Sequence, residues 1–165
     1  MNREFHPIDR NTWNRMPYFY YFTKMLPTGY SLTVEVDITN TYHTVKRGGK
    51  KFFPAYLYLA SRLIARQQEF RIAEQNGQLG YYEVLHPSYA CFHEDDKTMS
   101  SLWTEYDSAF ETFYSNYMED QKQNAGKHGI VAMTDLPDNN YMVGMLPWTQ
   151  FSSYAAGALW HLQKC

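Results

Sequence analysis

The stretch "SLTVEVDI", residues 31–38, alternates strictly between apolar and polar side chains. Successive side chains of an extended chain point to opposite faces, so this alternation suits a strand that buries one face and leaves the other in water. The face that would be buried carries Leu32, Val34, Val36 and Ile38. A chain with this stretch must form a sheet with one covered face, and we predict a half-buried strand over 31–38.

Two helices are predicted directly after this strand. The first covers 39–49, where Gly48 and Gly49 supply a helix stop. The second begins near Pro54, a residue suited to the first turn of a helix. Its predicted buried stripe, at helical spacing, consists of Tyr56, Leu57, Ala60, Leu63 and Ile64.

The second half of the chain mixes turn signals, short strands and one more helix. Asn76-Gly77 is a hairpin signal. A helix is predicted over 107–123, and the residues sharing its apolar face are Phe110, Phe113, Tyr114, Tyr117 and Met118. Strands are predicted at 79–84, 88–93, 98–104, 141–146 and 149–154. We therefore predict an α+β fold, a mostly antiparallel sheet with helices packed on it.

Length and composition fit one domain over residues 1–165. The 165 residues are 44% hydrophobic and 19% charged, which allows a sizeable core. The 15 basic and 17 acidic residues give a net charge of −2 and form no basic stripe, so no nucleic-acid binding is expected. No apolar run approaches the roughly 20 residues that span a bilayer, and no signal region opens the chain. We expect no membrane association and a cytoplasmic location.

Aromatic residues are unusually frequent, at 18% with 15 Tyr. This excess indicates an aromatic-lined cavity, a buried interface or a tyrosine-rich core. The run "YFYYF", residues 18–22, precedes a turn at Pro27-Thr28-Gly29. Five neighbouring aromatic side chains cannot all face one core, so some of them should line a pocket or an interface. Arg15, just before the run, is either a surface charge or a partner in a buried ion pair.

The histidines and cysteines form no familiar catalytic or metal-binding pattern. Cys91 and His93 fall on one face of a predicted strand, but no second pair at ligand spacing accompanies them, so no metal is predicted. With Cys165, the cysteines are too few for a disulfide framework. His86 is expected in a turn before Pro87. None of the six histidines has an obvious carboxylate nearby in sequence to orient it.

Five stretches together carry a resemblance to a known family. They are "FHPIDRNTWNR", "GYSLTVEVDIT", "KFFPAYLYLASRLIARQQEFRIA", "GQLGYYEVLHPSYACFHEDDKTMSSLWTEY" and "LPWTQFSSY". In this order and spacing the chain resembles chloramphenicol acetyltransferase of the classical trimeric type. The resemblance covers about residues 5–154, whereas the tail 155–165 diverges. It implies the two-layer sandwich of the CoA-dependent acyltransferases.

The resemblance also implies a reaction. The family transfers an acetyl group from acetyl-CoA to the 3-hydroxyl of chloramphenicol, without a metal and in a homotrimer whose active sites lie between subunits. A histidine acts as general base on that hydroxyl. A serine that matches Ser153 stabilises the oxyanion, and Ser152 would point to the opposite face of its strand.

Further site positions are implied one at a time. Tyr21 and Phe22 match aromatic residues that line the chloramphenicol pocket. Thr28 falls where some members have a pocket cysteine, and Met99 where members often have a pocket phenylalanine. Arg15 matches an arginine that pairs with an aspartate beside the catalytic histidine.

One family feature is missing from the 165 residues. The catalytic histidine belongs to an HHxxxDG motif, and neither "HH" nor "DG" occurs in this sequence. His161 does not match the motif. The resemblance therefore leads us to expect a domain that is incomplete at the C-terminus. The alternative is a non-catalytic remnant that binds a small aromatic ligand or only associates with itself.

Overall fold

The computed structural model describes residues 3–149 and residue 152. Within this part the chain forms two compact units, which are described separately. Residues up to 13 and 38–145 belong to the first unit, and residues 14–37 and those from 146 onward belong to the second. The prediction of one domain over 1–165 stays a prediction.

The first sheet of the larger unit is antiparallel throughout. Its strands are β1 (Phe5–Pro7), β2 (Ile72–Gln75) and β3 (Gln78–Tyr82), in the order β1-β3-β2. The turn between β2 and β3 is formed by Asn76 and Gly77, whose φ angles of 50° and 78° are both positive. Two positive φ angles are what a two-residue hairpin turn requires. The predicted hairpin is confirmed.

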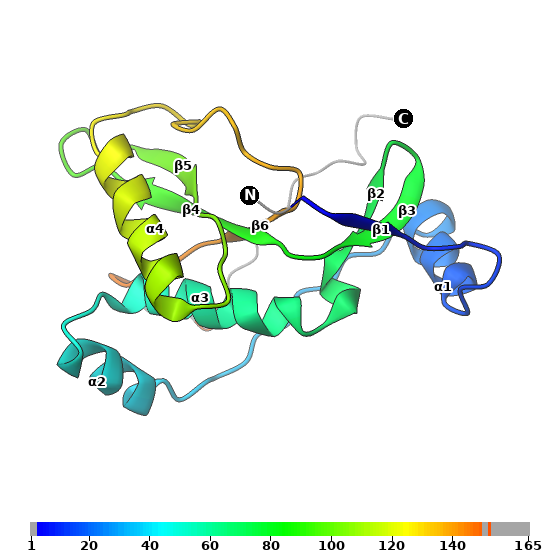
Figure 1. Ribbon diagram of the computed structural model, residues 1–165, viewed down its shortest axis with the longest axis horizontal. Coiled ribbons are helices and arrows are strands. Elements are labelled where there is room, and N and C mark those ends of the chain that lie inside the picture. Colours follow the sequence, from blue (N-terminus) through cyan, green and yellow to red (C-terminus); the bar gives the residue numbers. More distant parts are fainter. Residues whose placement is uncertain (1–2, 150–151, 153–165) are drawn as a thin grey trace. The chain divides into compact units, whose positions relative to one another are not determined.

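The second sheet has the order β5-β4-β6. β4 (His86–Phe92) pairs antiparallel with β5 (Met99–Trp103) and parallel with β6 (Asn140–Val143) (Figure 1). Most of the pairing in the two sheets is therefore antiparallel, as predicted. The strand predicted at 149–154 lies almost wholly outside the described residues.

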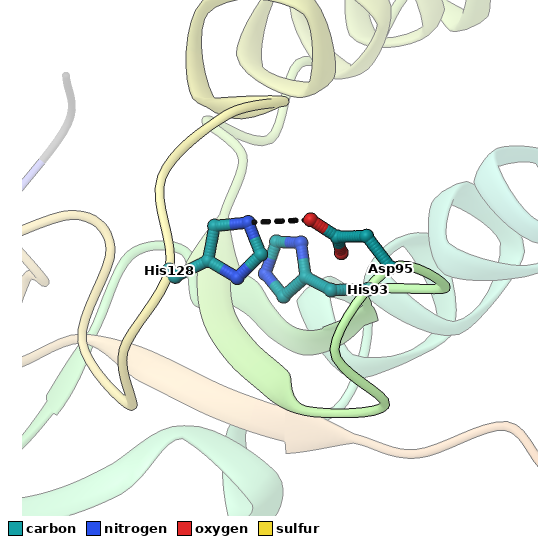
Figure 2. A group of neighbouring side chains, drawn as sticks. All are labelled: His93, Asp95 and His128. Carbon is teal, nitrogen blue, oxygen red and sulfur yellow. Dashed lines mark ion pairs between the residues drawn. The ribbon is translucent and has the colours of Figure 1, made fainter.

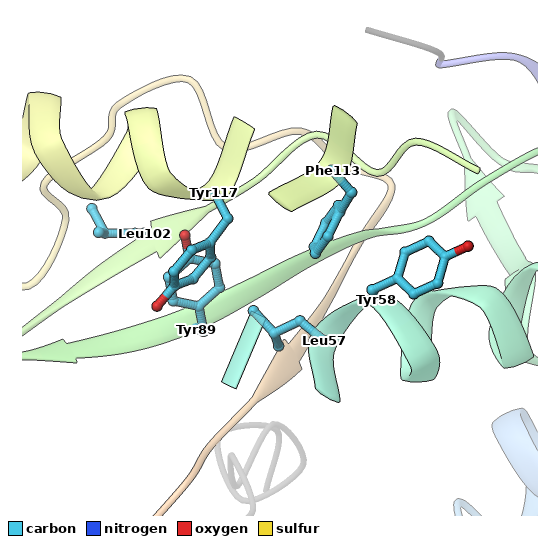
Figure 3. Packing of buried hydrophobic residues seen from close by; sticks show 6 residues of the cluster. All are labelled: Leu57, Tyr58, Tyr89, Leu102, Phe113 and Tyr117. Carbon is cyan, nitrogen blue, oxygen red and sulfur yellow. The ribbon is translucent and has the colours of Figure 1, made fainter. Parts of the chain in front are cut away.

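Two helices bury one face of this second sheet. They are α3 (Phe52–Ala65) and α4 (Phe110–Asn124). Side chains from both helices meet those of β4 and β5 in one hydrophobic cluster (Figure 3), made of Leu57, Tyr58, Tyr89, Leu102, Phe113 and Tyr117. Helices layered on a largely antiparallel sheet confirm the α+β class.

The buried stripe of α3 differs from the predicted one. The buried residues are Pro54, Ala55, Leu57, Tyr58 and Ser61, whereas Tyr56 and Leu63 are 40% and 62% exposed. The reason is that α3 carries apolar side chains on several faces, so periodicity does not select one. In the observed orientation the hydroxyl of Ser61 lies 2.7 Å from the Tyr141 hydroxyl of β6.

The region between β1 and β2 holds further helices but no strand among the described residues. α2 (Thr39–Arg47) confirms the predicted short helix, and η2 (Gln68–Arg71) is a 3₁₀ turn. The half-buried strand predicted over 31–38 is wrong for this structure, since Leu32, Val34 and Val36 are 78%, 67% and 70% exposed. Alternation specifies which face a strand would bury, but a strand also needs a partner. No described helix is long and apolar enough to cross a bilayer.

Leu57 and Leu63 allow a test of how α3 is oriented. Leu57 is fully buried and Leu63 is 62% exposed. We expect Leu57→Ala to lower the free energy of unfolding by about 2–5 kcal/mol, and Leu63→Ala to change it by no more than about 0.5 kcal/mol. Urea unfolding followed by circular dichroism measures both. Similar losses in the two variants would contradict this orientation of α3.

Candidate functional site

The aromatic run of the smaller unit is folded into two short helices. α1 (Met16–Tyr20) continues directly into η1 (Tyr21–Met25), a π-helical turn in which the Leu26 N–H donates to the Tyr21 carbonyl at 2.7 Å. The rings of Tyr21 and Phe22 lie edge to face, with centroids 5.1 Å apart. Both side chains are exposed, at 44% and 47%. A π-turn often marks a functional position, because it re-aims the side chains beside it.

Thr28 is tied to the same segment by its backbone. Its N–H donates to the Phe22 carbonyl at 3.0 Å, and its hydroxyl donates to the Leu26 carbonyl at 2.7 Å. Three of the predicted substrate-binding residues, Tyr21, Phe22 and Thr28, therefore belong to one locally hydrogen-bonded segment. Two perpendicular rings can hold the face and the edge of an aromatic ligand.

Arg15 stands at the start of this segment. Its carbonyl accepts a hydrogen bond from the Phe19 N–H at 2.9 Å, so it occupies the cap position of α1. The aspartate expected to pair with its side chain belongs to the motif that this sequence does not contain. The positioning role of Arg15 stays a prediction.

The remaining two predicted positions, Met99 and Ser153, do not belong to this segment. Met99 begins β5 in the larger unit, opposite Phe92 of β4, and is 54% exposed. Ser153 lies outside the described residues, while its neighbour Ser152 is exposed. The substrate contact of Met99 and the oxyanion role of Ser153 both stay predictions.

Two histidines have carboxylate partners that sequence reasoning missed. His6 Nε2 lies 3.1 Å from the Glu83 carboxylate, and His128 Nδ1 lies 2.7 Å from the Asp96 carboxylate. The partners are 77 and 32 residues away along the chain. No local pattern signals pairs at such separations, and only the fold brings them together.

The expectation for His86 was wrong. The residue is fully buried and begins β4 instead of lying in a turn. Its Nδ1 accepts a hydrogen bond from the Tyr106 N–H at 3.0 Å. A neutral ring that accepts through one nitrogen carries its proton on the other. His86 thus holds the chain after β5 in place through a buried hydrogen bond.

A separate cavity of about 520 Å³ lies beside α2 and α3. None of the predicted site residues lines it; its walls are formed by Asn40, Thr41, Thr44, Val45, Ala55, Tyr58, Leu59, Arg62 and Phe110. The volume is within the range of small-molecule pockets. The resemblance assigns it no role.

Comparison with known proteins decides the family. Residues 1–158 match the sequence profile described as "Chloramphenicol acetyltransferase". The chain belongs to the chloramphenicol acetyltransferase family. A chloramphenicol acetyltransferase of Clostridium perfringens is 40% identical over 151 residues, which cover 91% of this chain and 71% of that protein. One of Clostridioides difficile is also 40% identical over 151 residues, covering 91% of this chain and 69% of that protein.

The fold agrees with this family. A solved structure named "chloramphenicol acetyltransferase" has a TM-score of 0.77 to this chain at 19% sequence identity, over 93% of this chain and 75% of that one. This likeness confirms the predicted acetyltransferase-like α+β fold. The matched range 1–158 contains all six predicted site positions, Ser153 included. Acetyltransferases of this family use acetyl-CoA as the acetyl donor.

Proposed function

We propose that this chain serves acetyl transfer from acetyl-CoA to the 3-hydroxyl of chloramphenicol. Tyr21, Phe22, Thr28 and Met99 contact the acceptor, and Ser153 donates a hydrogen bond to the oxyanion. The observation that carries the proposal is the 40% identity to acetyltransferases over 91% of the chain. The hydrogen bond between Thr28 and Phe22 supports it further, because it gathers three of these positions in one segment.

The proposed reaction is a direct transfer between the two substrates. A histidine base takes the proton of the 3-hydroxyl while its oxygen attacks the thioester carbonyl. The tetrahedral intermediate carries a negative oxygen, which the Ser153 hydroxyl stabilises. The intermediate then expels the CoA thiolate, which takes the proton back from the histidine, and leaves the acetyl ester. The base belongs to the HHxxxDG motif, which these 165 residues do not contain.

A second candidate function is ligand binding without turnover. It is favoured by the exposed rings of Tyr21 and Phe22. In this case a fluorescence titration with chloramphenicol shows saturable binding, and no thiol is released even by a chimera that carries an HHxxxDG segment. Acetyl transfer and simple binding are thus separated by measuring binding and thiol release on that chimera.

One prediction concerns the activity of the chain. We expect the 165-residue chain to release no thiol from acetyl-CoA above a no-protein blank, with or without chloramphenicol, because it lacks the histidine base. Base catalysis typically contributes about 10²–10⁴-fold. A chimera in which a family-type segment carrying HHxxxDG replaces the residues after Tyr154 should show drug-dependent release.

One outcome would contradict this prediction, and another would contradict the proposed function. Drug-dependent release by the 165-residue chain would show that it holds a base, and His161 would be the first residue to replace. An inactive but folded chimera that binds both substrates would count against acetyl transfer as the function of these residues.

Ser153 is tested in the same chimera. If its hydroxyl stabilises the oxyanion, Ser153→Ala should lower kcat by roughly 10²–10³-fold, or about 2.7–4 kcal/mol. The KM for chloramphenicol should change little, since the bond strengthens only in the transition state. Ser152→Ala is the matched control and should lose much less. Equal losses in the two variants, or a change in KM alone, would remove Ser153 from the oxyanion role.

A further prediction concerns assembly. Leu32, Val34 and Val36 are exposed on one face of an alternating stretch, and such a stretch tends to associate with other chains. Light scattering after size exclusion should give a trimer, mixed oligomers or aggregate. Val34→Lys should reduce association, whereas Thr33→Lys, on the opposite face, should not. A clean monomer of 19.5 kDa would contradict the expected homotrimer.

A further inference from the structure

Three side chains with metal-binding atoms converge at the end of β4. His93 directly follows the strand, Asp95 lies in the turn before β5, and His128 comes from the loop after α4. One ligand atom from each lies within 4.8 Å of the others. Figure 2 shows the two imidazole rings face to face, with the Asp95 carboxylate turned toward them. Two imidazoles and a carboxylate are a common ligand set for zinc.

The spacing of His128 and Asp95 fits a shared ion. His128 Nε2 lies 3.3 Å from Asp95 Oδ2. Two ligand atoms at about 2.1 Å from a tetrahedral ion are about 3.4 Å apart. The side chain of Asp95 is 70% exposed, so it can adjust to an ion without disturbing the core.

Each imidazole is also fixed through its second nitrogen. His128 Nδ1 lies 2.7 Å from the Asp96 carboxylate, and His93 Nε2 lies 2.8 Å from the Ser100 hydroxyl. Partners of this kind orient metal-binding histidines. With these two nitrogens engaged, Nε2 of His128 and Nδ1 of His93 are the atoms left for a common ion.

Asp96 is itself held in place by hydrogen bonds. Its carboxylate accepts hydrogen bonds from the Thr98 hydroxyl at 2.7 Å and the Thr98 N–H at 3.0 Å. These two bonds fix the carboxylate beside His128 Nδ1, which lies 2.7 Å away.

The local charge favours a cation. The sequence "HEDDK" places three carboxylates, those of Glu94, Asp95 and Asp96, beside the single ammonium of Lys97. Lys97 pairs with Glu94 at 2.6 Å, away from the imidazoles. The rings of His93 and His128 are stacked with centroids 4.2 Å apart.

We propose that His93, Asp95 and His128 bind one divalent transition-metal ion, with Zn²⁺ the best match. The ion would join the turn between β4 and β5 to the loop after α4, and water would fill its remaining position. The sequence pattern paired His93 with Cys91, whose Sγ instead lies 3.7 Å from Gln121. The site is independent of acetyl transfer, so its test and the test of the proposed function can fail separately.

The experiment measures metal binding by the full chain without an affinity tag. Metal-free protein is titrated with Zn²⁺ in a calorimeter, and with Co²⁺ by visible absorption, whose intensity reports tetrahedral coordination. We expect one equivalent to bind. Loss of a residue that holds a metal ligand typically weakens binding by about 10–100-fold, and we expect this loss for Asp96→Asn. His128→Ala removes a ligand itself, so it should weaken binding by more than about 100-fold. His43→Ala, an exposed histidine on α2, is the control and should bind as the unaltered chain does.

A second measurement guards against variants that fold poorly. His128 and Asp95 have side chains that are 37% and 70% exposed, so His128→Ala and Asp95→Asn should keep the fold. Zn²⁺ should raise the melting temperature of the unaltered chain, a chelator should reverse the shift, and neither variant should respond. Equal affinity in His128→Ala and the unaltered chain, or no binding by the folded chain, would overturn the proposal and leave His128 as an ion-pair partner of Asp95 and Asp96.

Discussion

The larger unit depends on one buried phenol, that of Tyr89 in the middle of β4. Its ring is 1% exposed and lies 5.7 Å from Phe53 of α3 and 5.3 Å from Tyr117 of α4, measured between centroids. Its hydroxyl lies 2.8 Å from that of Thr104, which donates to Asp120 at 2.7 Å. Burial raises the pKa of both Tyr89 and Asp120. A buried phenol needs a hydrogen-bond partner, and Thr104 supplies it. The bond from Thr104 to Asp120 extends this hydrogen-bond network to α4.

The same strand connects the core to the proposed metal site. Tyr89 points into the cluster between α3 and α4, and a few residues later the chain leaves β4 with His93. His93 is 6% exposed and its partner Ser100 is 2% exposed, so the inner ligand is positioned by the packed sheet. Asp95 and His128 come from exposed segments and can adapt. A buried inner ligand with exposed outer ones suits an ion that joins two loops.

The residues proposed for acetyl transfer are positioned differently from the proposed metal ligands. Tyr21, Phe22 and Thr28 are held by short-range backbone bonds within one segment, so their grouping does not depend on the core of the larger unit. Met99 stands on the edge of β5, and Arg15 caps α1. The proposed function assigns these positions to one site.

The sequence by itself determined the features whose causes are local. Asn76-Gly77 formed its hairpin, α2 ended at the predicted glycines, and the quoted stretches were enough to indicate the acetyltransferase family. Only the tertiary structure decided that α3 buries Ser61 and exposes Leu63, and that His128 meets Asp95 and Asp96. Periodicity reports how residues on one helix relate to each other. Which of its faces is buried, and which distant side chain completes a pair, depends on contacts with segments far away in sequence.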